Sequence, residues 1–465
     1  MKLNDTIAAI ATPRGLGGIA IIRLSGEMAP EIAASLARPK CGKSVTDLES
    51  HKLTLCSIVS FDNPRLVIDE ALVSVMRAPK SYTGENVVEI NCHGGFLAAD
   101  KILTGLLKSG ARLAEAGEFT RRAFINGKTD LSGAEAVMDL MNSSTESGLH
   151  NAAVTLGGAL AEKINHLRSS VMELAAHVSA AADYPEEVDP PSEEELDGGF
   201  SLLQNEISAL LESFDKGRIM RDGVRTAIVG RPNVGKSSIL NALLRWERAI
   251  VTDIPGTTRD TIEELVTVGG IALRLTDTAG IHSTSDEVEK IGIERSRENL
   301  SDADLCLFVL DSSEEITDDD IKIAEALLSK KTILIINKTD KEAKFSPDEA
   351  SESLGLYPEA VILTSAPKGC DPMGIDALEA AISGIFTLGK VKPDEVYLAN
   401  ERQRDSLLRA QASLKCATDG LKSGMPYDLL FIDLEDTISA LGEVTGETVS
   451  EEIIDKVFEN FCVGK

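Results

Sequence analysis

The chain has 465 residues, too many for one ordinary domain, and its 43% hydrophobic and 26% charged residues are typical of a folded protein rather than a disordered one. Its 47 lysines and arginines are outnumbered by 75 aspartates and glutamates, and the net charge of −28 excludes a protein that holds nucleic acid by bulk electrostatic attraction, though not one with a local basic patch. The seven cysteines are scattered and form no C-x-x-C pair, so they predict neither a disulfide framework nor a zinc site. The sequence has no signal-peptide pattern and no apolar run of about 18 residues, which predicts a cytoplasmic protein with no membrane association.

Residues 1–127 predict a mixed α+β domain. Strand-like apolar runs lie at 6–10, 18–24, 52–60, 70–78 and 86–92, and helices fit 27–36, 95–109 and 117–126. The glycines at 15–18 form too weak a pattern for a phosphate loop, so a turn with positive φ is favoured there. Polar residues beyond what a core needs make this domain a candidate small-molecule site, although His93 is more typical of a helix start than of a catalyst and the pair Arg121-Arg122 of a solvated helix face.

Two stretches on either side of a central segment predict helices. In residues 128–222 these are 131–141, 142–178 and 200–216, with an acidic, proline-bearing loop at 183–199; in residues 387–465 they are 400–422, 428–441 and 450–461. We expect the two stretches to pack together as one all-α helical-bundle domain. The chain ends with Cys462 in the prenylation position, but Gly464 is not aliphatic and Lys465 is atypical, which leaves either a free surface thiol or a reactive one.

Residues 223–386 begin with a phosphate-loop pattern in its required context. An apolar run at 226–229 is followed by G-x-x-x-x-G-K-S at 230–237 and by a helix-like segment. Backbone N–H groups in such a loop cradle phosphate oxygens, while Lys236 supplies a charge for the β- and γ-phosphates and Ser237 a hydroxyl for Mg²⁺.

Two later motifs at strand ends indicate that the nucleotide is GTP. The first is D-T-A-G at 277–280, and the second is N-K-T-D at 337–340, where a carboxylate accepts two hydrogen bonds that guanine offers and adenine cannot. Strands alternating with helices predict a Ras-like α/β P-loop domain with a mostly parallel sheet. The predicted GTP-binding residues are Asn233, Val234, Gly235, Lys236, Ser237, Ser238, Thr252, Asp253, Ile254, Pro255, Gly256, Thr257, Thr258, Asp277, Thr278, Ala279, Gly280, Asn337, Lys338, Asp340, Ser365 and Ala366.

The hydrolysis machinery departs from the usual GTPase. Ile281 stands where many small GTPases have the glutamine that orients water. Asn233 either helps to bind a monovalent cation beside the phosphates or merely braces the loop. In the first switch, Thr258 is the favoured Mg²⁺ ligand, with Thr257 as the alternative. Glu289 either reaches the attacking water or complements a helix dipole.

Together these motifs resemble the MnmE (TrmE) family of bacterial and organellar tRNA-modifying GTPases. The resemblance covers nearly the whole chain and is carried by residues 5–9, 11–13, 82–85, 93–95, 117–119, 230–238, 252–260 and 291–295 and by the terminal Phe-Cys-x-Gly-Lys, in which Val463 stands where the family usually has isoleucine.

The resemblance implies sites and cofactors that the residues alone do not give. It implies a folate-binding and dimerising N-terminal domain for 5-formyl- or 5,10-methylene-tetrahydrofolate, helical parts at 128–222 and 387–465, and an inserted GTPase domain at 223–386. It also implies catalytic roles for Glu289 and Cys462. The implied folate contacts are Arg23, Glu89, Lys128 and Lys465, the K⁺ ligands Asn233, Thr252, Ile254 and Thr257, and the Mg²⁺ ligands Ser237 and Thr258.

The resemblance further implies a homodimer that joins the flavoprotein MnmG (GidA) in a heterotetramer. Together they would add a carboxymethylaminomethyl-type group to C5 of the wobble uridine, position 34, of certain tRNAs, with GTP hydrolysis to GDP coupled to dimerisation of the GTPase domains. Two alternatives stay open: a regulatory or ribosome-assembly GTPase without modification chemistry, and outer domains that serve only as a dimer scaffold.

Overall fold

The computed structural model describes residues 5–13, 15–184, 186–187, 189–246, 264–275, 302–365, 373–386, 395–459 and 461–464. Two compact units can be distinguished. One comprises Met1–Met138, Thr155–Glu206 and Asp405–Lys465, and the other Asp139–Val154 and Ile207–Arg404.

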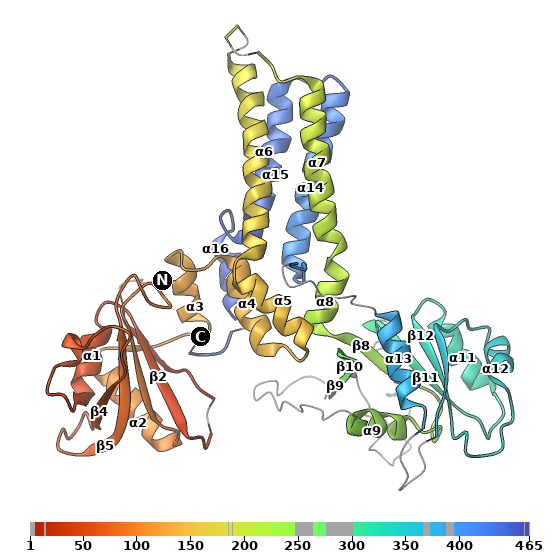
Figure 1. The fold of residues 1–465 in the computed structure, drawn as a ribbon, viewed down its shortest axis with the longest axis horizontal. Helices are drawn as coiled ribbons and strands as arrows, with labels where there is room; N and C mark the ends of the chain where they lie inside the picture. The colour runs from red at the N-terminus through yellow and green to blue at the C-terminus, as the bar shows by residue number, and fades with distance from the viewer. Residues whose placement is uncertain are drawn as a thin grey trace. The chain divides into compact units, whose positions relative to one another are not determined.

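The N-terminal part is built on a seven-stranded sheet with the order β3-β4-β5-β6-β2-β1-β7 (Figure 1). All neighbours are antiparallel except β1 and β7, which are parallel. The strands are β1 Ile7–Ile10, β2 Ile19–Ser25, β3 Ala37–Pro39, β4 Thr54–Val59, β5 Val67–Met76, β6 Val87–His93 and β7 Arg112–Leu113, and a 3₁₀ helix, η1, covers Val45–Asp47.

One face of this sheet is covered by helices. Side chains of α1 (Ala29–Leu36) and α2 (Phe96–Lys108) share a buried cluster with alternate residues of the strands, such as Ile22 and Leu24 on β2. A third helix, α3 (Glu118–Ile125), follows β7 and carries residues of a site described below. The alternation in β2 is the period-2 pattern expected of strands with one buried face.

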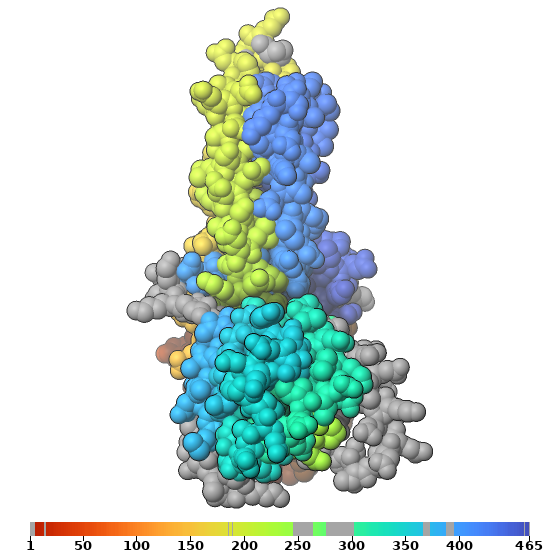
Figure 2. Space-filling view, turned by 90° about the vertical axis from the view of Figure 1, so that its right-hand side faces the viewer, coloured from red at the N-terminus to blue at the C-terminus, as the bar shows by residue number. Residues whose placement is uncertain are grey.

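The helical part contains α4 Leu131–Asn142, α5 Glu146–Leu156, α6 Ala159–Asp183, α7 Glu193–Glu212, α8 Phe214–Asp222, α14 Glu401–Lys422, α15 Tyr427–Thr445 and α16 Glu451–Glu459. Helices far apart in the sequence pack together: α6 lies along α15 (Figure 1), and Gln204 on α7 donates a hydrogen bond of 3.0 Å to Thr418 on α14. Figure 2 shows α7 in yellow-green beside the blue residues of α14 and α15. The prediction of one helix over 142–178 is wrong, because α5 ends before Gly157-Gly158 and Gly158 takes a left-handed conformation with φ of 94°.

The α/β part has a six-stranded sheet with the order β13-β12-β11-β8-β10-β9, parallel except for the β9–β10 pair. Its strands are β8 Val224–Val229, β9 Glu264–Val268, β10 Ile271–Leu275, β11 Leu305–Asp311, β12 Thr332–Asn337 and β13 Ala360–Leu363. Helices α9 (Lys236–Trp246) and α13 (Ile375–Ile385) pack on one buried cluster, and α11 (Asp318–Leu327) and α12 (Pro347–Leu354) on another. Every residue of β11 is buried, as expected of a central strand covered on both faces.

These observations confirm the predicted fold class: an α+β N-terminal part, a helical part and a mostly parallel α/β part. A tight turn at Gly269-Gly270 joins β9 to β10, with φ of 57° and 79°. Within the described ranges, no helix combines the length and the apolar character that crossing a membrane would require.

Candidate functional site

The phosphate loop leaves the carboxyl end of β8 and leads into α9. Glycine is required at two of its positions. A Cβ on Gly230, whose φ is 144°, would lie 2.3 Å from the carbonyl oxygen of Val309, and a Cβ on Gly235, whose φ is 105°, would lie 2.1 Å from Nδ2 of Asn337. The loop is therefore packed too tightly against β11 and β12 for any side chain at these positions.

Lys236 points back over the loop that precedes it. Its Nζ donates hydrogen bonds to the carbonyl oxygens of Gly230, at 2.6 Å, and Arg231, at 2.8 Å. Burial lowers the pKa of Lys236 from its usual value. The ammonium group is thus held at the mouth of the loop, where an anionic ligand would favour its charged form.

The N-K-T-D segment holds the phosphate loop in place. Asn337 Nδ2 donates to the carbonyl oxygen of Val234 at 2.9 Å, and Lys338 Nζ donates to that of Asn233 at 2.7 Å. Lys338 also forms an ion pair of 2.6 Å with Asp311, a buried carboxylate at the end of β11. Burial is the largest single effect and acts to raise the pKa of Asp311. Hydrogen bonds from Lys338 and Ser313 together with the charge of Lys338 outweigh it and keep the pKa below its usual value, so the pair is charged.

The predicted guanine site keeps an exposed acceptor. Ser365 Oγ donates a hydrogen bond of 2.6 Å to Asp340 Oδ1, and this bond lowers the pKa of Asp340 from its usual value. An ionised carboxylate at this position can accept both N–H groups on one edge of guanine.

The structure brings only part of the predicted GTP and metal site into view. Ser237 lies in the first turn of α9 and is half-buried, while Asn233 and Ser238 are exposed. The other predicted residues lie outside the described residues: Thr252, Asp253, Ile254, Pro255, Gly256, Thr257, Thr258, Asp277, Thr278, Ala279, Gly280, Glu289 and Ala366.

A second site is built on the N-terminal sheet. Arg23 on β2 lies directly opposite Glu89 on β6, and its Nε donates a hydrogen bond of 2.9 Å to Glu89 Oε1. The guanidinium carbon of Arg23 is 5.5 Å from the ring centre of Tyr82 and 5.7 Å from that of Phe119. Both distances are within the range of cation–π contacts, so the guanidinium lies close to two aromatic rings.

The end of the chain reaches this site. Arg23 donates a hydrogen bond of 3.3 Å to the carbonyl oxygen of Gly464, 441 residues away in the sequence. Val463 forms an antiparallel bridge with Ala116, and the N–H of Gly117 donates to the carbonyl oxygen of Cys462 at 3.3 Å. Cys462 itself is exposed, and Lys465 lies outside the described residues.

Lys128, the remaining predicted folate contact, lies beside the loop that carries Tyr82. Its Nζ donates to the carbonyl oxygen of Pro79 at 3.3 Å, and its aliphatic stem packs against Gly84. Among the described residues, no hydrogen bond links Lys128 to Arg23 or Glu89. Three of the four predicted contacts therefore lie on or beside the elements that surround Arg23.

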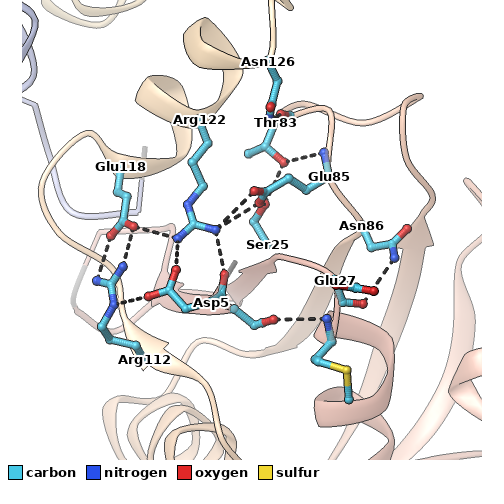
Figure 3. A network of polar contacts seen from close by, with 12 residues as sticks. Asp5, Ser25, Glu27, Thr83, Glu85, Asn86, Arg112, Glu118, Arg122 and Asn126 are labelled. Atoms are coloured by element: carbon cyan, nitrogen blue, oxygen red, sulfur yellow. Dashed lines mark hydrogen bonds and ion pairs between the residues drawn. The ribbon is translucent and has the colours of Figure 1, made fainter. Parts of the chain in front are cut away.

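Arg122 contradicts the prediction of a solvated helix face, because its side chain is only 1% exposed. It donates to Asp5 Oδ1 at 2.6 Å, to Glu118 Oε1 at 2.9 Å and to Glu85 Oε2 at 3.2 Å (Figure 3). The i,i+4 pair of Glu118 and Arg122 was the available signal in the sequence. The network joins α3 to the loop of Tyr82 through the ion pair of Arg122 with Glu85. Ser25 extends it, because its hydroxyl donates a hydrogen bond to Glu85 and forms another with Thr83.

Glu118 is buried but remains charged. Burial acts to raise the pKa of Glu118, whereas hydrogen bonds from Arg112, from the N–H of Glu115 and from Arg122 outweigh it and hold the pKa below its usual value. Buried charges are tolerated when they are paired and hydrogen-bonded in this way.

The glycine-rich turn differs from its prediction. Gly15, Gly17 and Gly18 do not have positive φ values among the residues described. The tight contact is made instead by Gly94, because a Cβ there would lie 2.2 Å from the carbonyl oxygen of Gly17. The Nδ1 atom of His93, next to it, lies within hydrogen-bond distance of Asp69 Oδ1, at 2.6 Å.

Comparisons with known proteins cover the whole chain. A family described as "MnmE helical domain" matches residues 131–462, and one described as "GTP-binding protein TrmE N-terminus" matches residues 6–128. The tRNA modification GTPase MnmE of Bacillus licheniformis is 46% identical, covering 99% of this chain and 100% of its own length. Those of Bacillus subtilis, at 45% with the same coverage, and Clostridioides difficile, at 44% with complete coverage of both chains, are similarly related.

Proposed function

Because this chain belongs to the MnmE family of tRNA modification GTPases, we propose that it is a K⁺-dependent GTP hydrolase that works with the flavoprotein MnmG in the cytoplasm. The two proteins would add a carboxymethylaminomethyl-type group to C5 of the uridine at position 34 of certain tRNAs. A tetrahydrofolate derivative, 5-formyl or 5,10-methylene, would provide the one-carbon unit. The division into 1–127, 128–222, 223–386 and 387–465 is part of this proposal.

One observation carries the proposal: the same chain holds a braced phosphate loop and a separate Arg23–Glu89 site that is completed by its own end. A GTPase that acts only as a timed switch has no need of the second site. The family relationship favours modification chemistry over a ribosome-assembly switch.

The K⁺ dependence rests on Asn233. Its φ of 64° is in the left-handed region, and Lys338 fixes its backbone carbonyl. Its exposed side chain makes no hydrogen bond with the residues that the structure describes, which supports a ligand role over a bracing role. Asn233, Thr252, Ile254 and Thr257 would hold the K⁺, and Ser237 and Thr258 would hold Mg²⁺. The cations would neutralise negative charge that develops on the phosphates.

The K⁺ proposal is tested by the GTP turnover of the full chain in KCl and in NaCl at equal ionic strength. We expect hydrolysis to be much faster in KCl and Asn233→Ala to remove most of that difference. Pro232→Ala, at the exposed neighbouring position, is the control and should keep it. Equal turnover of the unaltered chain in both salts would contradict the proposal.

The folate proposal rests on the surroundings of Arg23. A reduced folate offers a planar pterin and carboxylate groups, and the site offers a guanidinium close to two aromatic rings, the carboxylate of Glu89 and the ammonium of Lys128. Lys465 is the fourth proposed contact, and Cys462 is proposed to take part in the modification chemistry.

Equilibrium binding of 5-formyl-tetrahydrofolate to the full chain tests this site. We expect Arg23→Ala to weaken binding at least tenfold, since charge-assisted hydrogen bonds contribute about 1.5–3 kcal/mol. Arg65→Ala, an exposed arginine of the same domain, should leave binding unchanged. Unchanged binding in Arg23→Ala would rule out this location.

The homodimer and the heterotetramer with MnmG complete the proposal, with GTP hydrolysis coupled to dimerisation of the GTPase domains. Mass analysis of wobble uridines from cells lacking this protein tests the function as a whole. Normal modification in such cells would favour the regulatory alternative.

A further inference from the structure

Positive charge is concentrated in one part of this acidic chain. Residues 6–128 contain 15 lysines and arginines against 12 aspartates and glutamates, a net charge of +3. The rest of the chain has 32 against 63, a net charge of −31 within the total of −28. Internal ion pairs, such as those of Glu85 and Glu118 with Arg122, neutralise acids and arginines together and so leave this positive balance unchanged.

Five of these basic residues lie along one connected edge of the domain. Arg77, which follows β5, donates hydrogen bonds to the carbonyl oxygens of Thr46, at 2.6 Å, and Leu48, at 3.2 Å, so the end of β5 lies against the η1 segment. Lys80 closes the turn that Arg77 begins, with its N–H on the carbonyl oxygen of Arg77 at 2.9 Å. The term basic edge denotes these five residues, which are Lys43, Lys52, Arg77, Lys80 and Lys128.

The two ends of the basic edge are fixed by other contacts. Lys52 forms an ion pair with Glu49, and the charge of Lys43 also acts on that carboxylate. At the other end, Lys128 donates to the carbonyl oxygen of Pro79, next to Lys80. The edge therefore runs from the η1 segment to the side of the proposed folate site.

The charges of the basic edge are available to a ligand. All five side chains are exposed. Among the described residues, those of Lys43 and Lys80 form no hydrogen bond or ion pair, and those of Arg77 and Lys128 bond only carbonyl oxygens, which leaves their charges uncompensated. Asp47 and Glu49 are the acids of the η1 segment, and they offset two of the five charges.

We propose that the basic edge binds the phosphate backbone of the substrate tRNA. The inference rests on the proposed function, and it assigns the tRNA to a surface that ends beside the one-carbon donor. Lysines and arginines spaced along an edge fit a row of phosphates, because such contacts need charge and reach rather than base-specific geometry. An anionic membrane is the other polyanion to consider, and tRNA is favoured because the proposed function already has tRNA as its substrate.

The test is tRNA binding by the full chain, with an unmodified, fluorescently labelled tRNA transcript that carries uridine at position 34. Anisotropy titrations are run at several NaCl concentrations with K⁺ held constant. Lys43→Glu/Lys80→Glu should weaken binding at least tenfold and lower the slope of log affinity against log salt by about 1.5, since each phosphate contact contributes about 0.7–0.9. The matched control is Lys163→Glu/Lys415→Glu, two exposed lysines on α6 and α14 with the same change in charge, which should weaken binding less than threefold.

Equal weakening of tRNA binding by both pairs of substitutions would show that the net charge of the chain determines affinity, and it would overturn the proposal. Unchanged binding in Lys43→Glu/Lys80→Glu would also overturn it, as would undetectable binding by the unaltered chain at low salt. Binding to phosphatidylglycerol vesicles that tRNA does not compete away would point to the membrane instead. Circular dichroism monitors folding, and Lys43→Gln/Lys80→Gln replaces the first pair if that pair is unfolded. tRNA binding is measured without folate or GTP. A negative tRNA result would therefore not contradict the proposed folate and GTP sites, and negative results at those two sites would not change the meaning of the tRNA result.

Discussion

Arg122 and Glu118, one turn apart on α3, form an ion pair of 2.9 Å in which neither side chain is more than 1% exposed. Arg121, which directly precedes Arg122, also forms an ion pair with an acid, but its partner Asp455 is half exposed. Two neighbouring arginines of one helix thus form ion pairs that differ in exposure: both members are buried in the pair of Arg122, whereas in the other Arg121 is 20% and Asp455 51% exposed.

Arg122→Met should therefore destabilise the N-terminal part far more than Arg121→Met. Removing one member of a buried charged network costs about 3–5 kcal/mol. The pair of Arg121 is partly screened by water at Asp455, so its contribution should lie nearer the value of about 0–1 kcal/mol that is typical of surface pairs. Urea denaturation followed by circular dichroism measures the difference. Similar losses in the two variants would mean that the network around Arg122 is not a stabilising one.

The same network predicts how stability depends on pH. The pKa values of Glu118 and Asp5 are held below their usual values, in each case by hydrogen bonds from arginines that outweigh the opposing effect of burial. A carboxyl whose pKa is lower in the folded state contributes stability above its unfolded pKa of about 4, and this contribution is lost as the pH falls through the folded value. Glu118→Gln should lower the urea midpoint at pH 7 and flatten its decline between about pH 5 and pH 3. A parallel decline in the variant would show that Glu118 is not one of the groups responsible.

The end of the chain provides a third prediction. Gly464 has a φ of 99°, and a Cβ there would lie 2.6 Å from the carbonyl oxygen of Ile10. Gly464→Ala should displace the segment that bonds Arg23 and weaken 5-formyl-tetrahydrofolate binding about tenfold, while GTP binding stays the same. Gly424→Ala is the matched control, because Gly424 has a φ of 68° but no atom within 4 Å of its added Cβ. If both variants bind folate like the unaltered chain, the terminal segment is not part of the site.

Base selection should depend on Asp340. Asp340→Asn replaces an acceptor pair with one acceptor and one donor, so GTP affinity should fall at least about tenfold and xanthosine triphosphate should bind better than GTP. Competition against a fluorescent GTP analogue measures both. Ser365→Ala, which removes only the hydrogen bond to Asp340, should weaken GTP binding without changing the preferred base.

Glu289, which lies outside the described residues, gives a kinetic prediction. If it orients the attacking water, Glu289→Ala slows GTP hydrolysis by about 10²- to 10⁴-fold with nearly unchanged GTP affinity. Single-turnover hydrolysis and equilibrium binding separate the two quantities. A large loss of affinity would instead assign Glu289 a structural role.

The sequence predicts best where chemistry and local structure depend on neighbouring residues. The strand, glycine loop and helix around Gly235 were predictable, and so was the turn at Gly269-Gly270, since each depends on glycine conformations within a few residues. The break before α6 was missed, although Gly157-Gly158 costs a helix about 1 kcal/mol per glycine. The periodicity of Ala and Leu on both sides concealed it.

Long-range relationships were not accessible in the same way. Nothing in the local pattern pairs Arg23 with Glu89, because 66 residues and three other strands separate them and their contact depends on sheet register. The burial of Arg122 likewise depends on Asp5 and Glu85, which come from distant segments. The resemblance to a family suggested the first pair, and only the fold revealed the second set.

The hydrogen bond between Arg23 and Gly464 also has a consequence for how the protein is made. The domain that carries Arg23 leaves the ribosome early, but a part of its site is synthesised 441 residues later. A nascent or prematurely terminated chain that contains Arg23 therefore still lacks that part. The proposed folate site would therefore be complete only after synthesis has passed Gly464.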